Sequence, residues 1–239
     1  MAFPFFYIES VSNIDNILLL SEENSKHIVQ VLRMGEGKQL NLTDGLGTIY
    51  IAEILDAHKK KCTVKIIHTS KQHTNSQPVC VAVSPVKNNS RFEWFLEKAT
   101  EMGVTEIVPL LCERTEKQYL KFDRLRGILI SAMLQSQQAW LPVLHEPVKF
   151  VKFVKENLST NKFIAHCEEA NKISLKEIMS KASNKPMNQT TILIGPEGDF
   201  TKDEINIALE NNFTPVALGD TRLRTETAAL VAATLLCIN

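Results

Sequence analysis

Two short segments near the carboxyl end of the chain carry the residues best suited to chemistry. Residues 194–200 and 218–226 each follow an apolar run rich in β-branched residues and lead into a helical pattern. In open α/β sheets, ligands bind at the carboxyl ends of the strands. Either segment alone can be a structural turn, because Gly and Pro favour tight turns. Arg224 and Glu226, at the start of an otherwise apolar helix, favour a ligand site, since charges in such a place usually have partners or a function.

The segment Gly195-Pro196-Glu197-Gly198 restricts the kind of ligand. It lacks the Gly-x-Gly-x-x-Gly pattern of dinucleotide sites and the Gly-Lys-Ser/Thr ending of phosphate loops. A loop stiffened by Pro offers fixed backbone N–H and C=O groups, which suit a neutral heterocycle such as adenine better than an anion.

Other candidate sites are weaker. His166-Cys167-Glu168-Glu169 follows a further strand, 162–165, but one His with one Cys lacks the ligands of a metal site, so a pocket-lining loop is the preferred interpretation and no metal is expected. The Ser and His residues show no spacing typical of a hydrolase. Basic residues cluster at 59–61, at Lys87 with Arg91, and along 117–126, where a solvated face is the simplest explanation.

Composition sets further limits. The 239 residues are 44% hydrophobic, which is enough for one large domain or two small ones. Lys plus Arg equals Asp plus Glu at 27 each, so any RNA-binding surface must be local. The five cysteines are scattered and never spaced as Cys-x-x-Cys, which fits a reducing cytoplasm. No segment approaches about 18 consecutive apolar residues, so we expect a soluble cytoplasmic protein.

The chain divides into two predicted domains, 1–72 and 73–239. The pattern of the first domain predicts mostly β structure, with strands over 5–8, 39–43, 48–54 and 62–68 and a hairpin turn at Asp44-Gly45. A helix over 22–34 has Ser21 placed to cap it and Gly35 placed to close it. The polar, aperiodic stretch 70–78 is typical of a linker.

After residue 78 the pattern alternates between strands and helices. Strands over 79–84 and 106–111 are followed by helices over 91–102 and 123–138. Such alternation predicts a parallel sheet. Capping boxes that begin at Ser90, Ser174 and Thr201, each with Glu three residues later, support an α/β fold.

Together these motifs resemble the RsmE-type ribosomal RNA methyltransferases of the SPOUT superfamily, which transfer a methyl group from S-adenosylmethionine to N3 of a uridine in 16S ribosomal RNA. The resemblance spans nearly the whole chain. In the first domain it rests on 27–34 and Asp44-Gly45, and in the second on 97–104, Pro109, Glu113-Arg114 and both terminal loops.

The resemblance implies a PUA-like β-barrel that helps to hold RNA, joined to an α/β SPOUT domain whose carboxyl-terminal backbone forms a trefoil knot. General rules of chain topology argue against knots, so only the resemblance predicts this one. It also implies a homodimer, with the second subunit completing the site, and ribosomal RNA of the small subunit or its assembly intermediate as partner. The residues carried over as S-adenosylmethionine-binding are His166, Gly195, Pro196, Glu197, Gly198, Leu218, Gly219, Leu223, Arg224, Thr227 and Ala228. Those carried over as RNA-binding are Arg33, Lys87, Arg91 and Arg114.

The expected catalytic residues are Arg224 and Glu226. Uridine N3 must lose its proton before or during methyl transfer, and Arg224 is placed to stabilise the resulting anion. Glu226 either orients Arg224 through a hydrogen bond or accepts the proton, with the first role preferred. The small residues at 228, 229, 232 and 233 suggest a dimer face, with packing inside the chain as the alternative.

One departure from the family affects the RNA side. Relatives often have an acidic residue and Gln-Ser-Gly-Arg before a Pro, where this chain has Gln135-Ser136-Gln137-Gln138-Ala139-Trp140-Leu141-Pro142. The usual Arg is absent, so another residue must replace any RNA contact it makes. A non-catalytic RNA-binding assembly factor and an α/β enzyme acting on a small nucleotide remain the alternative functions.

Overall fold

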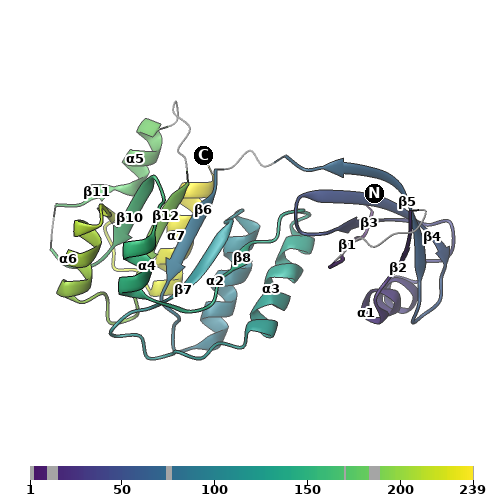
Figure 1. Ribbon diagram of the computed structural model, residues 1–239, viewed down its shortest axis with the longest axis horizontal. Coiled ribbons are helices and arrows are strands. Elements are labelled where there is room, and N and C mark those ends of the chain that lie inside the picture. The colour runs from purple at the N-terminus through teal and green to yellow at the C-terminus, as the bar shows by residue number, and fades with distance from the viewer. Residues whose placement is uncertain (1–2, 10–15, 74–76, 170, 183–188, 239) are drawn as a thin grey trace. The chain divides into compact units, whose positions relative to one another are not determined.

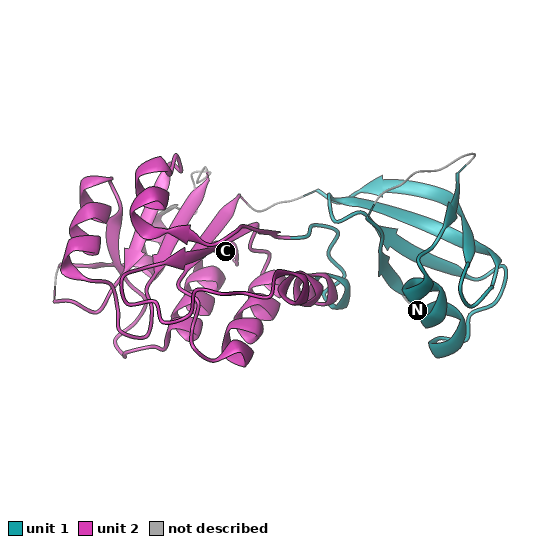
Figure 2. Ribbon diagram, turned by 60° about the horizontal axis from the view of Figure 1, so that its bottom comes forward, with its two compact units in different colours: residues 1–74, 133–141 teal, residues 75–132, 142–239 magenta. Residues whose placement is uncertain are grey.

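The computed structural model describes residues 3–9, 16–73, 77–169, 171–182 and 189–238 (Figure 1). The chain forms two compact units, residues 1–74 with 133–141 and residues 75–132 with 142–239 (Figure 2). The middle of the predicted linker, 74–76, lies outside the described residues. The first unit thus includes a segment, 133–141, that the sequence alone assigned to the second domain.

The described residues of the first unit form a five-stranded sheet in the order β1-β3-β4-β5-β2. Its strands are β1 (Phe5–Tyr7), β2 (Ile17–Leu19), β3 (Gln39–Thr43), β4 (Thr48–Asp56) and β5 (Thr63–Lys71). β1 and β3 are parallel, and the other pairs are antiparallel. β1 and β2 each pair with one strand only, so they are the edges of an open half-barrel. Leu40, Leu42, Ala52 and Val64 are fully buried in its core, as the alternating pattern requires. The three longer strands were predicted, whereas β2 was not.

A short helical segment covers this core. It consists of α1 (Glu22–Lys26) and a π-helical turn, η1 (His27–Val31). The predicted cap is confirmed, since the Ser21 side chain accepts a hydrogen bond from the backbone N–H of Asn24 at 3.2 Å. The predicted closure at Gly35 is wrong. Arg33 takes the left-handed conformation, with φ 52°, and the next residue, Met34, donates its N–H to the carbonyl of Ile28.

The hairpin between β3 and β4 turns at the predicted place. Asp44 Oδ1 accepts hydrogen bonds from the backbone N–H groups of Leu46, at 2.8 Å, and Thr48, at 3.2 Å. Gly47 has φ 88°, and a Cβ there would overlap the ring of Trp140. Only glycine fits this position, for both backbone and steric reasons.

Trp140 belongs to the segment 133–141, which packs within the first unit. The helix that leads into it, α3 (Phe122–Gln135), ends three residues before its predicted end. Gln137 stands at φ 56°, and Gln138 donates its N–H to the carbonyl of Met133 at 3.0 Å, which closes the helix. Trp140 then donates its indole N–H to the carbonyl of Gln72 at 3.0 Å.

The second unit contains a sheet in which every described pair of strands is parallel, as predicted, in the order β11-β13-β10-β12-β6-β7-β8 with β9 also pairing with β7. Its strands are β6 (Val79–Val83), β7 (Glu106–Leu111), β8 (Val143–Leu144), β9 (Val148–Lys149), β10 (Asn161–Ala165), β11 (Ile173–Ser174), β12 (Thr190–Ile194) and β13 (Thr214–Ala217). Ile194 pairs with both Val83 and Ala165, so three strands end at the same level. The segments that follow them therefore lie along one edge.

Helices cover both faces of this sheet (Figure 1). They are α2 (Asn89–Glu101), α4 (Phe150–Glu156), α5 (Leu175–Ala182), α6 (Lys202–Glu210) and α7 (Thr225–Cys237). On one face, α4 and α6 pack with Cys80 and Ala82 of β6 around Phe150 and Phe200. On the other face, α7 packs against β6, β12 and α2. Coverage of both faces explains why β6 and β12 are buried along their whole length.

The helix caps agree only in part with the sequence. The capping box at Thr201 is present: its hydroxyl accepts from the N–H of Glu204 at 3.2 Å, and the Glu204 carboxylate accepts from the N–H of Thr201 at 2.9 Å. The capping box predicted at Ser90 is wrong, because α2 begins at Asn89 and the Asn88 side chain caps it. Asn and Ser are about equally good caps, so composition alone could not separate them.

The small-residue face of α7 lies inside the chain. Ala229, Ala232 and Ala233 are fully buried. Their size allows α7 and α2 to approach closely, so the expectation that these three residues form a dimer face is wrong, whereas Ala228 is half-buried and the homodimer itself stays a prediction. The chain leaves β13, on one side of β10, and returns to place α7 on β12 and β6, on the other side. The trefoil knot stays a prediction.

Candidate functional site

A pocket of about 390 Å³ opens between the two carboxyl-terminal loops. Seven of its lining residues were predicted from the sequence as cofactor-binding or catalytic: Gly195, Pro196, Glu197, Leu223, Arg224, Glu226 and Ala228. An eighth, Arg91, was predicted to bind RNA. The residues that sequence reasoning missed are Ala165, Cys167, Ile194, Asp199, Arg222 and Thr225. All six directly adjoin predicted positions, so the loops as a whole, rather than single residues, were the signal that could have identified them. The structure therefore brings two loops that are separated by α6 and β13 into one site.

Five predicted cofactor residues do not line this pocket: His166, Gly198 and Thr227, which adjoin lining residues in the sequence, and Leu218 and Gly219, which precede the lining part of the second loop. Gly219 has φ 148°, and a Cβ built there would meet no atom within 4 Å. Its backbone faces open space. At Gly198, by contrast, a Cβ would lie 3.3 Å from Cδ of Arg114, so packing within the chain accounts for this glycine.

Glu226 is buried at the first turn of α7, where the helix dipole favours a negative charge. Its Oε1 lies 3.7 Å from Nε of Arg91, whose side chain is 42% exposed. The predicted hydrogen bond to Arg224 is not formed in the described structure. The carboxylate instead faces an arginine from α2, 135 residues earlier in the chain, and no sequence pattern indicated that these two residues would pair. No hydrogen bond within the described residues occupies its oxygens.

Arg224 precedes α7 as its N-terminal cap residue, with extended backbone at φ −70° and ψ 156°. Its carbonyl accepts the first intrahelical bond, from the N–H of Ala228 at 2.7 Å. The side chain is exposed at the pocket and makes no hydrogen bond or ion pair with any other described residue. The backbone is thus fixed while the guanidinium is available to a ligand.

Two residues predicted to bind RNA also support the loop 195–201. The backbone N–H of Lys87 donates to Oε1 of Glu197 at 3.1 Å, and Arg114 donates to the carbonyl of Gly198 at 2.6 Å. Arg33, the remaining predicted RNA contact, is exposed on the first unit. The Lys87 and Arg114 contacts come from segments after β6 and β7, so neighbouring strand ends hold the loop from two directions.

Asp199 provides a third support. It has φ 63°, an uncommon conformation for a residue other than glycine. Its carboxylate accepts hydrogen bonds from the backbone N–H of Cys167, at 2.8 Å, and of its neighbour Phe200, at 2.9 Å. The loops after β10 and β12 are thereby tied together. Preorganisation of this kind lowers the entropic cost of ligand binding.

His166 carries the most unusual polar atoms of the site. It is 8% exposed, and neither ring nitrogen has a hydrogen-bond partner within the described structure. Burial lowers the pKa of His166, with a smaller effect from nearby Lys172. Buried polar atoms without partners are rare and call for an explanation such as a bound ligand. A neutral imidazole beside fixed backbone groups fits the uncharged polar edge of a heterocycle such as adenine.

Metal and membrane sites are not indicated in the described part of the chain. No group of three or more His, Cys, Asp or Glu side chains there is placed to hold a metal ion. Among the same residues, no helix has the length and apolar character needed to cross a membrane.

Known proteins share both units. Residues 73–237 match the family model of the RNA methyltransferase domain, and residues 20–67 match that of the RNA methyltransferase PUA domain. The ribosomal RNA small subunit methyltransferase E of Synechocystis sp. is 32% identical over 92% of this chain and 72% of its own length.

Solved structures agree with this assignment. The crystal structure of a probable rRNA-methyltransferase from Porphyromonas gingivalis is 35% identical, with a TM-score of 0.88 over 98% of both chains. A methyltransferase from Legionella pneumophila, solved with the bound cofactor SAM, is 30% identical, with a TM-score of 0.84 over 99% of this chain and 97% of its own. With a matching family model over most of its length and a site at the expected sheet edge, this chain belongs to the ribosomal RNA small subunit methyltransferase E family of the SPOUT superfamily.

Proposed function

We propose that this protein transfers the methyl group of S-adenosylmethionine to N3 of a uridine in 16S ribosomal RNA. The observation that carries the proposal is the pocket itself, in which the two carboxyl-terminal loops meet a buried carboxylate and two arginines. The family and its SAM-bound member support the cofactor. Bound there, S-adenosylmethionine supplies an electrophilic methyl group on a sulfonium.

The loops would hold the cofactor with the residues carried over from the family. Gly195, Pro196 and Leu223 line the pocket and offer backbone groups and apolar surface. His166 and Gly219 belong to the same strand-end segments, the first with ring nitrogens that have no partner among the described residues and the second with open space at its α-carbon. Both features are explained if a heterocycle approaches these positions.

The charged residues would act on the uridine. Arg224 is exposed at the pocket and unpaired within the described residues, so we assign it to the uracil oxygens, where it would stabilise the negative charge that develops as N3 loses its proton. Glu226 faces Arg91 and has no hydrogen bond among the described residues. Its carboxylate is therefore available to accept that proton, and we now favour this role over orienting Arg224.

Methylation of small ribosomal subunits that lack the modification tests these roles. With labelled S-adenosylmethionine at saturating subunit concentration, Glu226→Gln should lower turnover by about 10²- to 10⁴-fold, the usual contribution of a general base. Arg224→Ala should also lower turnover. Asp220→Asn is the matched control, because this exposed carboxylate precedes the same helix in the same loop. Wild-type turnover in both Arg224→Ala and Glu226→Gln would contradict the mechanism.

The remaining expectations concern the whole protein. We propose that the first unit helps to hold the RNA, that Arg33 contributes to this contact, and that the protein acts as a cytoplasmic homodimer. Light scattering should then give twice the chain mass of 26.9 kDa at micromolar concentration. A mass equal to one chain would refute the dimer without affecting the cofactor site.

A further inference from the structure

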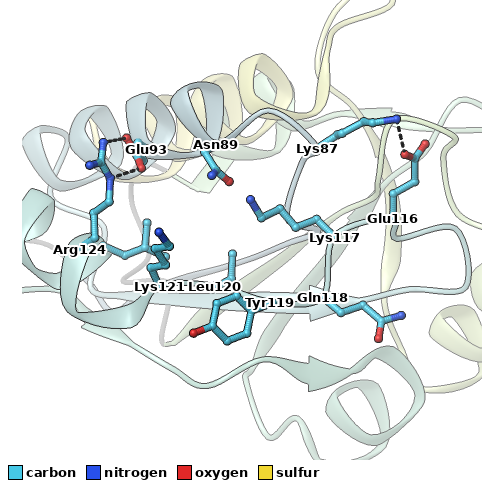
Figure 3. Close-up of a pocket in the computed structure, with 11 residues that line it drawn as sticks. Lys87, Asn89, Glu93, Glu116, Lys117, Gln118, Tyr119, Leu120, Lys121 and Arg124 are labelled. Carbon is cyan, nitrogen blue, oxygen red and sulfur yellow. Dashed lines mark hydrogen bonds and ion pairs between the residues drawn. The ribbon is translucent and has the colours of Figure 1, made fainter.

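A second pocket, of about 440 Å³, lies on the second unit (Figure 3). The loop 116–121 forms one side of it, and the first turns of α2 and α3 form the other. Its volume falls in the range of about 300–1,000 Å³ that is typical of ligand sites. The sequence showed the basic residues here only as a cluster, for which a solvated face was the simplest explanation.

The charges around this pocket are not balanced. Arg124 makes a two-pronged contact with Glu93, with Nε–Oε1 and Nη2–Oε2 distances of 2.5 and 2.8 Å. Lys87 lies 3.0 Å from Glu116. Both carboxylates that line the pocket are thus already paired.

Two further ammonium groups line the pocket, those of Lys117 and Lys121. Neither has a carboxylate within ion-pair distance among the described residues. Lys117 extends toward the space between Asn89 and the loop (Figure 3). The pocket therefore carries a surplus of two positive charges, which fits an anionic ligand.

An aromatic ring accompanies these charges. Tyr119 lies between the two lysines in sequence, lines the pocket and is 77% exposed. An exposed ring that buries little of its surface in the fold is a platform on which a planar group can stack. Aromatic platforms beside lysines are the usual means of binding single-stranded nucleic acid, since bases stack on the ring and phosphates contact the ammonium groups.

A hydrogen bond connects a residue of this pocket to the methyl-transfer site. Lys87 lines the pocket, while the backbone N–H of the same residue is bonded to Glu197 of the cofactor loop. Asn89 and Glu93, which also line it, flank Arg91 on α2, and Arg91 faces Glu226. Residues from the first turns of α2 thus line both pockets, with Asn89 and Glu93 in the second and Arg91 in the first.

We propose that this pocket binds a nucleotide of the RNA substrate close to the target uridine, with its base stacked on Tyr119 and its phosphates neutralised by Lys117 and Lys121. This inference rests on the proposed function. It adds an RNA subsite to that function.

The first test is kinetic. Tyr119→Ala should lower kcat/KM on unmethylated small subunits by about 5- to 150-fold, the value of one base–aromatic stack. Tyr119→Phe keeps the ring and should stay near wild type. Affinity for S-adenosylmethionine, measured by calorimetry, should be unchanged in both. Equal kcat/KM in wild type and Tyr119→Ala would overturn the inference, whereas absence of methylation by the wild type would instead refute the proposed function.

The lysines are tested through salt dependence. Lys117→Ala and Lys121→Ala should each reduce the slope of log affinity for the subunit against log salt by about 0.7, the value for one phosphate contact on a single strand. Lys155→Ala, an exposed lysine at the end of α4, is the control and should leave the slope unchanged. Slopes equal to that of the control would overturn the phosphate contacts.

Crosslinking identifies the partner. With Tyr119→p-benzoylphenylalanine, irradiation on the small subunit should attach the protein to 16S ribosomal RNA. Attachment to a ribosomal protein, or no more crosslinking than with the same group at position 155, would overturn the inference.

Discussion

Glu204 connects the cofactor loop, 195–201, to the loop that follows β7. Its replacement should lower both the stability of the fold and the affinity for S-adenosylmethionine. Glu204 is 6% exposed. Its Oε2 accepts from the backbone N–H of Thr201 at 2.9 Å, and its Oε1 accepts from the backbone N–H of Glu113 at 2.8 Å. In Glu204→Gln, the amide oxygen can keep one of these bonds, but the NH₂ group faces the other donor. The variant therefore loses at least one bond to a charged group.

The expected loss follows from that geometry. A hydrogen bond to a charged group contributes about 1.5–3 kcal/mol, and both N–H groups are partly buried, so we expect the free energy of unfolding to fall by about 1.5–3 kcal/mol. Removing the negative charge from the first turn of α6 should lower the free energy of unfolding by roughly a further 0.3–1 kcal/mol, because the helix dipole favours a negative charge there. Urea denaturation followed by circular dichroism measures the sum.

A matched control separates the two effects. Asp203→Asn removes the same charge from the same helical turn, but Asp203 is exposed and makes no hydrogen bond within the described residues. It should cost less than about 1 kcal/mol. The same series should show weaker binding of S-adenosylmethionine only in Glu204→Gln. If the two variants lose equal stability, the reasoning from the Glu204 hydrogen bonds is refuted.

Three further predictions test other parts of the structure. Cys167, the exposed cysteine that lines the cofactor pocket, should react with a maleimide faster than buried Cys80, and S-adenosylmethionine should slow that reaction. Because burial lowers the pKa of His166 in the folded protein below the ordinary 6.5, the unfolded chain binds more protons just below pH 6.5. Stability should fall as pH drops through 6.5, less so in His166→Gln, as urea titrations between pH 7.5 and 5.5 would show. Gln137→Gly should raise stability by about 0.5–1 kcal/mol in the same assay, because Gln137 has φ 56°.

The parallel sheet and the position of the site were predictable from local patterns. β6 and β12 are buried on both faces, so each appears in the sequence as a continuous apolar run. A glycine or a polar residue follows each strand, which marks the carboxyl edge. Periodicity, burial and turn chemistry all act within a few residues of each other, and this is why a single sequence records them.

The errors arose where local signals were nearly equal or where the partner was distant. Asn88 caps α2 in place of Ser90, and Arg33 rather than Gly35 takes the left-handed position. The pairing of Glu226 with Arg91 joins segments more than 130 residues apart and depends on how α2 and α7 pack. No pattern of charge along the sequence contains that information.

The loop after β7 relates the two pockets energetically. Its first part is held by hydrogen bonds: the Thr115 hydroxyl lies 2.8 Å from that of Ser84, in a buried contact, and the backbone N–H of Glu113 donates to Glu204. Its second part, 116–121, carries the lysines and Tyr119 of the proposed RNA subsite. Because Glu204 also fixes Thr201 of the cofactor loop, order gained in one loop favours order in the other. By linkage, any increase in RNA affinity caused by the cofactor must equal the increase in cofactor affinity caused by RNA. Glu204→Gln, which leaves every residue of both pockets in place, should reduce that mutual increase, and this distinguishes a coupling residue from a contact residue.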